Sequence, residues 1–189
     1  MEHALILSPS EKGTDFLTQA LTAAGIRCVT ALQTGEAARG LLHEQTFDLV
    51  VINAPLRDEF GESLACGLTE SGQCQALLLV KTQIWETVAR RTEDSGVITL
   101  PKPIDPMLLH SALHLAAVTH KRLQNLQQEN QRLLQKITDT RTVGRAKCVL
   151  VSRMSVSEPE AHRYIEKLAM DQRQTRCQVA EEILRTYGL

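Results

Sequence analysis

The sequence predicts an α/β domain of the (βα)5 type with a mainly parallel sheet, then a long coiled-coil helix that leads into an all-α three-helix bundle. Three observations predict this order. Short apolar runs alternate with amphipathic segments up to about residue 118. A leucine-rich stretch with heptad spacing follows. Two capping signals then begin two short helices near the C-terminus.

Five apolar runs mark the predicted strands: Ala4–Leu7, Cys28–Leu32, Phe47–Ile52, Ala76–Val80 and Val97–Leu100. Runs such as DLVVIN and ALLLVK are continuously apolar, which is typical of central parallel strands covered on both faces. The segments between the runs have helical spacing, and Gly25 is placed to end the first of them. We therefore expect a parallel sheet with helices on both faces.

This part of the chain resembles the receiver domain of bacterial response regulators, a flavodoxin-like fold, over about residues 1–118. The resemblance rests on N-A-P-L-x-x-x-x-G, which begins at Asn53 after the third strand, and on L-P-K-P, which begins at Leu100 after the fifth. It implies a cis peptide bond before Pro103.

The resemblance also implies where receiver chemistry would occur. In receivers, an aspartate after strand three accepts a phosphoryl group, and an acidic pair after strand one binds Mg²⁺. Here Asn53 stands at the acceptor position, and an amide cannot form an acyl phosphate. We expect a pseudo-receiver whose degenerate phosphoacceptor pocket contains residues that follow the first, third, fourth and fifth strands: Ser8, Ser10, Asn53, Thr82 and Lys102.

Two alternatives stay open for this pocket. Carboxylates from elsewhere in the domain, namely Glu11, Asp58 or Glu59, could lie close to it. Lys102 is also expected to donate hydrogen bonds to loop carbonyls rather than to bind phosphate.

A heptad repeat predicts a dimer seam, because its members are spaced 3, 4, 3 and 4 residues apart: Leu123, Leu126, Asn130, Leu133 and Ile137. Leucine at d positions with a single Asn at an a position is typical of a two-stranded parallel coiled coil. Ala112, Ala116 and Thr119 extend the pattern backwards. The alternative is one long helix that packs against its own domain. No proline lies between Pro106 and Pro159, so the helix can be unbroken.

The charge is unevenly distributed, although the net charge is only −1. Residues 1–106 contain 8 Lys and Arg against 14 Asp and Glu, a balance of −6, whereas residues 107–189 contain 13 against 8, a balance of +5. A basic C-terminal region is typical of proteins with a polyanionic partner, and the alternative is a solvated helix surface.

Other features narrow the class of protein. The sequence has no apolar run long enough to span a membrane and no signal peptide, and its five cysteines are scattered, so we expect a cytoplasmic protein with reduced thiols. It lacks a phosphate-binding loop and a nucleophile elbow. His110 and His114 lie four residues apart but lack a third metal ligand. We therefore expect no enzyme activity, no metal and no cofactor.

The last two helices begin at capping boxes, Ser157 with Glu160 and Thr175 with Gln178. Helical spacing predicts that Tyr164 is buried beside Leu168, with stacking on a base as the alternative. The final helix is expected to end near Gly188.

This region resembles the ANTAR domain, the RNA-binding module of bacterial transcription antiterminators, over about residues 130–187. The resemblance is carried by R-A-K at Arg145, S-x-x-E-A at Ser157, L-A-M-D at Leu168 and T-x-x-x-V-A-x-x-I-L at Thr175. It implies a pseudo-receiver at 1–118, a linker helix at 119–138 and an RNA-binding domain at 139–189. The sequence departs from the family at Thr140, Cys148 and His162.

The resemblance implies a function and a set of contacts. ANTAR proteins bind tandem stem-loops in nascent mRNA and prevent a terminator from forming. The expected RNA-binding residues are cationic or lie at the start of the last helix: Arg141, Arg145, Lys147, Arg173, Thr175 and Arg176. The alternative interpretation of each cationic residue is a solvated surface side chain. The alternative for Thr175 is a helix cap with no RNA contact.

Regulation is expected to come through a protein or ligand at the pseudo-receiver. Two other functions remain open. One is a coiled-coil adapter or anti-activator that binds proteins, and the other is a DNA-binding response regulator.

Overall fold

The structure is a computed structural model that describes residues 1–72 and 74–187, so Gly188 lies outside it. The chain divides into two compact units. The first runs from Met1 to Gln124 and the second begins at Asn125. Within the described residues, no helix is both long enough and apolar enough to cross a lipid bilayer.

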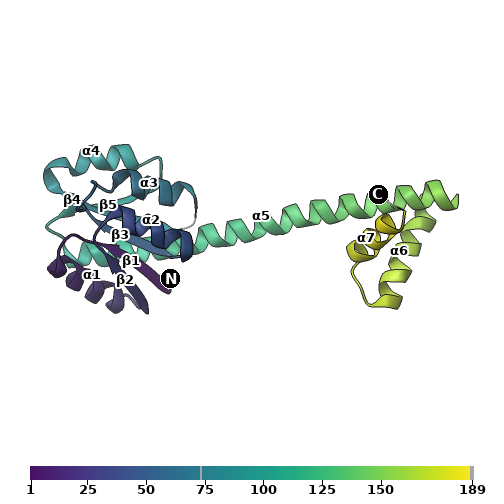
Figure 1. Cartoon of the computed structure of the whole chain (residues 1–189), viewed down its shortest axis with the longest axis horizontal. Helices are drawn as coiled ribbons and strands as arrows, with labels where there is room; N and C mark the ends of the chain where they lie inside the picture. Colours follow the sequence, from purple (N-terminus) through teal and green to yellow (C-terminus); the bar gives the residue numbers. More distant parts are fainter. Residues whose placement is uncertain (73, 188–189) are drawn as a thin grey trace. The chain divides into compact units, whose positions relative to one another are not determined.

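The first unit is a five-stranded parallel sheet in the order β2-β1-β3-β4-β5, with helices between the strands (Figure 1). Its elements are β1 (His3–Leu7), α1 (Glu11–Ala23), β2 (Cys28–Leu32), α2 (Gly35–Glu44), β3 (Leu49–Asn53), α3 (Glu62–Glu70), β4 (Gln75–Lys81), α4 (Thr82–Thr92), β5 (Ile98–Lys102) and the start of α5 (Pro106–Met154). The five predicted strands and the α/β fold are thereby confirmed.

Two apolar layers hold the sheet. Leu17 and Leu21 of α1 pack with α5 against one face, and helices α2, α3 and α4 cover the other face. Figure 1 shows α1 on one side of the strands and α3 and α4 on the other. Successive strand residues alternate between the two layers, because strand side chains point to opposite faces of a sheet. This explains why the central strands are apolar at every position.

Helix α5 contributes to both units. Ala112 and Ala116 are buried against the sheet. The prediction that these alanines extend the dimer seam backwards was therefore wrong. Their small side chains let α5 lie close to the strands, and 3–4 spacing buries a helix against a sheet as readily as against a partner helix. Residues 121–138, which include the whole predicted seam, are exposed.

The second unit packs the end of α5 with α6 (Glu158–Gln172) and α7 (Arg176–Thr186). The core of this three-helix bundle is formed by small and aliphatic side chains: Ala146, Leu150, Ala161, Ile165, Ala169, Val179, Ala180, Ile183 and Leu184. Both predicted capping boxes are confirmed. The backbone N–H of Ser157 donates to Glu160 (2.8 Å), and that of Thr175 donates to Gln178 (2.9 Å).

Candidate nucleic-acid interface

A cleft of about 510 Å³ lies among the three helices of the second unit. Helix α5 contributes Lys147 to it, and the start of α7 contributes Thr175 and Arg176. Three of the six predicted RNA-binding residues therefore share one cleft. Its full lining is Asp139, Thr140, Val143, Gly144, Lys147, His162, Thr175, Arg176 and Cys177.

Lys147 is the cation that α5 brings to the cleft. Its ammonium group forms an ion pair with Glu158, the first residue of α6. The hydrogen bond and the positive charge of Lys147 hold the pKa of the Glu158 carboxyl below its ordinary value. The Lys147 side chain is only partly exposed, whereas Glu158 stands largely in solvent.

Arg176 is the cation at the start of α7, and it forms an ion pair with Glu166 of α6 (3.2 Å). His162, one helical turn before Glu166, lies 3.3 Å from the same carboxylate oxygen. Arg176 also lines a second cleft of about 500 Å³ on the α6–α7 side of the unit, which contains Arg173. Arg176 thus lines both clefts, which together hold four of the six predicted residues.

Thr175 is engaged as a helix cap. Its hydroxyl donates to Oε1 of Gln178 (3.1 Å) and accepts from the Gln178 backbone N–H (3.2 Å). Arg173 ends α6 with a left-handed backbone (φ 54°) and turns the chain towards α7. These two residues therefore set the geometry of the turn that presents Arg176.

Arg141 and Arg145 lie on another face of α5. They are four residues apart and exposed, and neither lines either cleft. Lys147 follows Arg145 by two residues, which corresponds to a rotation of about 200° around an α-helix. The six predicted residues therefore fall into a cleft group and an outer group on α5.

Several cleft residues were not predicted from the sequence as site residues. His162 and Glu166 form an i, i+4 pair on α6, a spacing that sequence inspection can detect. Asp139 and Cys177 come from α5 and α7, and no local pattern joins them. Burial and the Asp139 carboxylate raise the pKa of the Cys177 thiol to about 11, so this thiol is neutral at pH 7.

The expected burial of Tyr164 was wrong, because its side chain is exposed. Tyr164 precedes the buried Ile165 by one position and so points about 100° away from it around α6. It lines neither cleft.

At the carboxyl edge of the sheet, the side chain at the expected phosphoacceptor position, Asn53, belongs to a chain of hydrogen bonds that runs from Lys102 to Ser10. The Lys102 ammonium donates to Oδ1 of Asn53 (2.9 Å) and to the Ala54 carbonyl. The Asn53 amide donates to the Ser8 hydroxyl (3.1 Å), which donates to the Ser10 carbonyl (3.1 Å). Burial, followed by the nearby charge of Lys81, lowers the pKa of Lys102.

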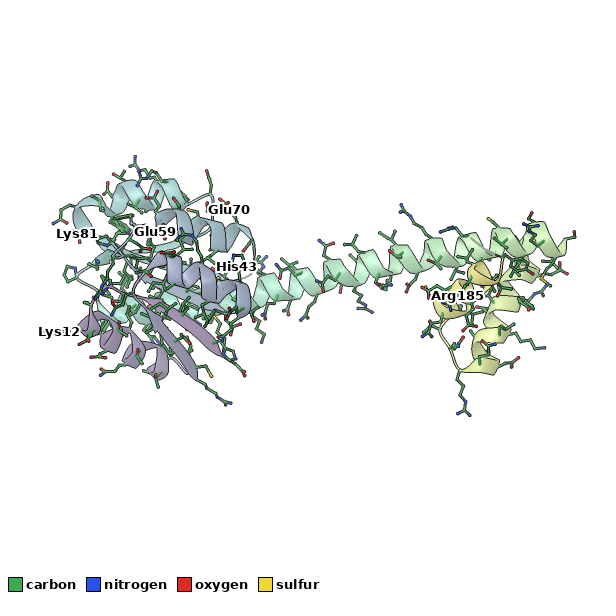
Figure 2. All side chains as sticks on the ribbon, in the orientation of Figure 1. Lys12, His43, Glu59, Glu70, Lys81 and Arg185 are labelled. Atoms are coloured by element: carbon green, nitrogen blue, oxygen red, sulfur yellow. The ribbon has the colours of Figure 1, made fainter. Side chains whose placement is uncertain are left out.

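The remaining pocket residues bind backbone groups. The Thr82 hydroxyl donates to the Lys102 carbonyl (2.7 Å), and the Ser10 hydroxyl accepts from the Gly13 N–H (3.2 Å). Asp58 instead accepts from two N–H groups at the start of α2, and Glu59, labelled in Figure 2, pairs with Arg39 (2.8 Å). Among residues 1–72 and 74–187, no three His, Cys, Asp or Glu side chains gather as metal ligands.

Gly13 closes this pocket from the first turn of α1. A Cβ atom at Gly13 would lie 2.7 Å from Nδ2 of Asn53 and 2.8 Å from Oγ of Ser8. We expect Gly13→Ala to destabilise the first unit by about 1–3 kcal/mol, because the added methyl group would force hydrogen-bonded side chains apart. Urea unfolding measures the change.

Gly40→Ala is the matched control, since Gly40 lies within α2 and has no atom within 4 Å of its added Cβ. That change should stabilise by up to about 1 kcal/mol, the usual gain from replacing a helical glycine. If Gly13→Ala stabilised the first unit as much as Gly40→Ala, the close packing of α1 on the pocket would be contradicted.

Comparison with known proteins identifies relatives of the chain and a known domain within its second unit. Residues 131–184 match the family model of the ANTAR domain. The chain is 26% identical over 172 residues to the transcriptional regulatory protein PdtaR of Mycobacterium tuberculosis, covering 91% of this chain and 84% of that protein. It is 30% identical over 92 residues to the aliphatic amidase regulator of Pseudomonas aeruginosa, covering 49% of this chain and 46% of the regulator.

Solved structures resemble the first unit in fold. A signal receiver domain of an HD domain-containing protein from Pseudomonas fluorescens aligns with a TM-score of 0.56 and 20% identity, covering 67% of this chain and 92% of that domain. The chemotaxis response regulator CheY4 of Vibrio cholerae aligns with a TM-score of 0.52 and 19% identity, covering 61% and 98%. The chain therefore contains a segment, residues 131–184, that matches the ANTAR domain, and its N-terminal unit has the receiver fold.

Proposed function

We propose that the chain is an RNA-binding transcription antiterminator that binds tandem stem-loops in nascent mRNA and so prevents a terminator hairpin from forming. One observation carries the proposal: the segment that matches the ANTAR domain contains a cleft whose cations come from two different helices. The name of one relative, a transcriptional regulatory protein, supports a role in transcription control, and that of another, an amidase regulator, supports a regulatory role.

RNA loops suit this cleft chemically. Their unstacked bases and closely spaced phosphates are bound by side chains that combine positive charge with hydrogen bonding. Lys147 and Arg176 supply charge in the first cleft, and Arg173 supplies it in the second. Arg141 and Arg145 would contact the RNA backbone beyond the clefts, while Thr175 holds the start of α7.

A parallel homodimer through the heptad seam is part of the proposal. The apolar seam residues are exposed to solvent, which is costly unless another surface covers them; Leu126, for example, is 60% exposed. Two linked protomers could bind two neighbouring stem-loops, and linkage raises the overall affinity.

We infer that the receiver-like unit, in a cytoplasmic protein, receives its signal from a partner protein or a ligand rather than from phosphorylation. Asn53 offers an amide where an acyl phosphate would need a carboxylate, and its amide is hydrogen-bonded to Ser8. Lys102, the lysine of this pocket, already donates to Asn53 and to the Ala54 carbonyl.

The test is a filter-binding titration with a tandem stem-loop RNA, at low and moderate salt, beside a DNA duplex of equal length. We expect selective binding to the RNA that weakens steeply with salt, with a slope of log affinity against log salt of about −0.7 to −0.9 for each phosphate bound. Equal weak binding to both, or none by a confirmed dimer, would contradict the proposal. It would favour the coiled-coil adapter, and preference for the duplex would favour the DNA-binding regulator.

A further inference from the structure

Both principal cations of the first cleft are held by carboxylates of a single helix. Lys147 pairs with Glu158 and Arg176 pairs with Glu166, and both glutamates belong to α6. The two glutamates lie eight residues apart, which is about two helical turns. Helix α6 therefore presents two negative charges to the two side chains that the proposed function assigns to RNA phosphates.

We propose that Glu158 and Glu166 are internal competitors of RNA, which occupy Lys147 and Arg176 in the free protein and are displaced when RNA phosphates bind. This inference rests on the proposed RNA-binding function. It assigns to α6 a role in setting the affinity of the cleft, in addition to its role in the bundle core.

The exposure of the pairs supports exchange rather than a structural role. The side chains of Glu158, Glu166 and Arg176 are 62%, 43% and 58% exposed, and that of Lys147 is 24% exposed, so each pair has at least one partner largely in solvent. Ion pairs in such solvated positions contribute little to stability, so a ligand that offers phosphates can replace the carboxylates at small cost.

Besides its pair with Arg176, Glu166 contacts only His162 of the same helix (3.3 Å) among the ion pairs of residues 1–72 and 74–187, and neither glutamate belongs to a capping box or to the core. The core of the unit is aliphatic, and the capping boxes that start α6 and α7 use Glu160 and Gln178. Glu158 and Glu166 can therefore be replaced without removing a cap or a core side chain.

Displacement of the glutamates by RNA changes how steeply RNA affinity depends on salt concentration. When RNA neutralises its phosphates with protein cations, counterions leave the RNA, and affinity falls as salt rises. A glutamate released from its lysine or arginine is a bare carboxylate that attracts a cation from solution. That uptake offsets part of the release, so the wild-type protein should have a shallower salt slope than a variant without the glutamates.

The experiment compares wild type, Glu158→Gln, Glu166→Gln and the double variant in titrations with a tandem stem-loop RNA, at several salt concentrations. Each single change should raise RNA affinity about two- to fivefold, the range that corresponds to losing one exposed ion pair. The double variant should gain about tenfold and have the steepest salt slope. Glutamine keeps the size and the hydrogen-bonding oxygen of glutamate, so the change is mainly one of charge.

Asp171→Asn is the matched control. Asp171 lies on the same helix, is exposed and forms no ion pair within residues 1–72 and 74–187, so its replacement removes the same charge without freeing a cation. An equal gain from Asp171→Asn would mean that overall charge is responsible and would overturn the inference. Unchanged or weaker RNA binding by the Glu158 and Glu166 variants would overturn it too.

The outcomes separate this inference from the proposed function. If the wild type prefers the stem-loop RNA to duplex DNA and the Glu variants behave like Asp171→Asn, only the competitor role is overturned. If neither the wild type nor any variant prefers that RNA at low salt, both proposals are overturned. Thermal unfolding of each variant verifies that the second unit remains folded.

Discussion

Replacing Leu126 and Leu133 together by lysine is expected to lower the affinity for a tandem stem-loop RNA about 10²- to 10⁴-fold, because the linkage between two RNA-binding units is lost. Both leucines occupy d positions of the seam and are exposed in the single chain. In a parallel dimer, four lysine ammonium groups would enter the apolar interface, and an unpaired buried charge is strongly unfavourable. Sedimentation measures the loss of the dimer, and RNA titration measures the loss of affinity.

The control places the same charge on the outside of the same helix. Gln124→Lys with Gln131→Lys has the same seven-residue spacing but occupies b positions, which lie outside the seam. These changes should leave the dimer intact and should not weaken RNA binding. Affinity for a single stem-loop should be similar in both variants. Retention of the dimer after Leu126→Lys and Leu133→Lys would rule out the heptad seam as the interface.

Replacing Lys147 and Arg176 together by alanine should lower the affinity for a single stem-loop about 10²- to 10⁴-fold at moderate salt. Each side chain is expected to donate a charge-assisted hydrogen bond to phosphate, and each such bond is worth about 1.5–3 kcal/mol. The change also leaves Glu158 and Glu166 without their partners, so two free carboxylates would face the RNA. The salt slope should become shallower by less than about 1.4–1.8, because two phosphate contacts are lost but the wild-type slope is already reduced by cation uptake at the displaced glutamates.

Arg163→Ala with Lys167→Ala is the matched control for charge. Both residues are exposed on α6, line neither cleft, and point away from the face that holds Ile165. Their loss should weaken binding only a few-fold, through the general attraction between a basic surface and RNA. Equal losses in the two double variants would locate RNA binding outside the first cleft.

Several features follow from local sequence alone. Apolar runs predicted all five strands, because parallel strands covered on both faces need apolar side chains at every position. The two capping boxes predicted where α6 and α7 begin, because a cap depends on residues only three positions apart. The chemistry of Asn53 also follows from the residue itself, since an amide is not a phosphoryl acceptor.

Other predictions failed where a periodic pattern has two physical solutions. Ala112 and Ala116 have the same spacing as the seam residues, yet they pack on the sheet of their own unit. Tyr164 lies close enough to the core positions in the sequence to suggest burial, yet its place at the border of the apolar face leaves it exposed. Spacing identifies a face of a helix but not the surface that covers it.

The sequence by itself determined the order of elements, the helix starts and the absence of a carboxylate at the position of Asn53, because these depend on neighbouring residues or on one side chain. Only the tertiary structure decided which cations share a cleft and which carboxylates hold them. Lys147, Glu158, Glu166 and Arg176 come from three helices. Their proximity arises from how those helices pack around a core that includes Ala146, Ala161 and Ala180. The spacing of residues along the sequence does not predict such contacts between helices.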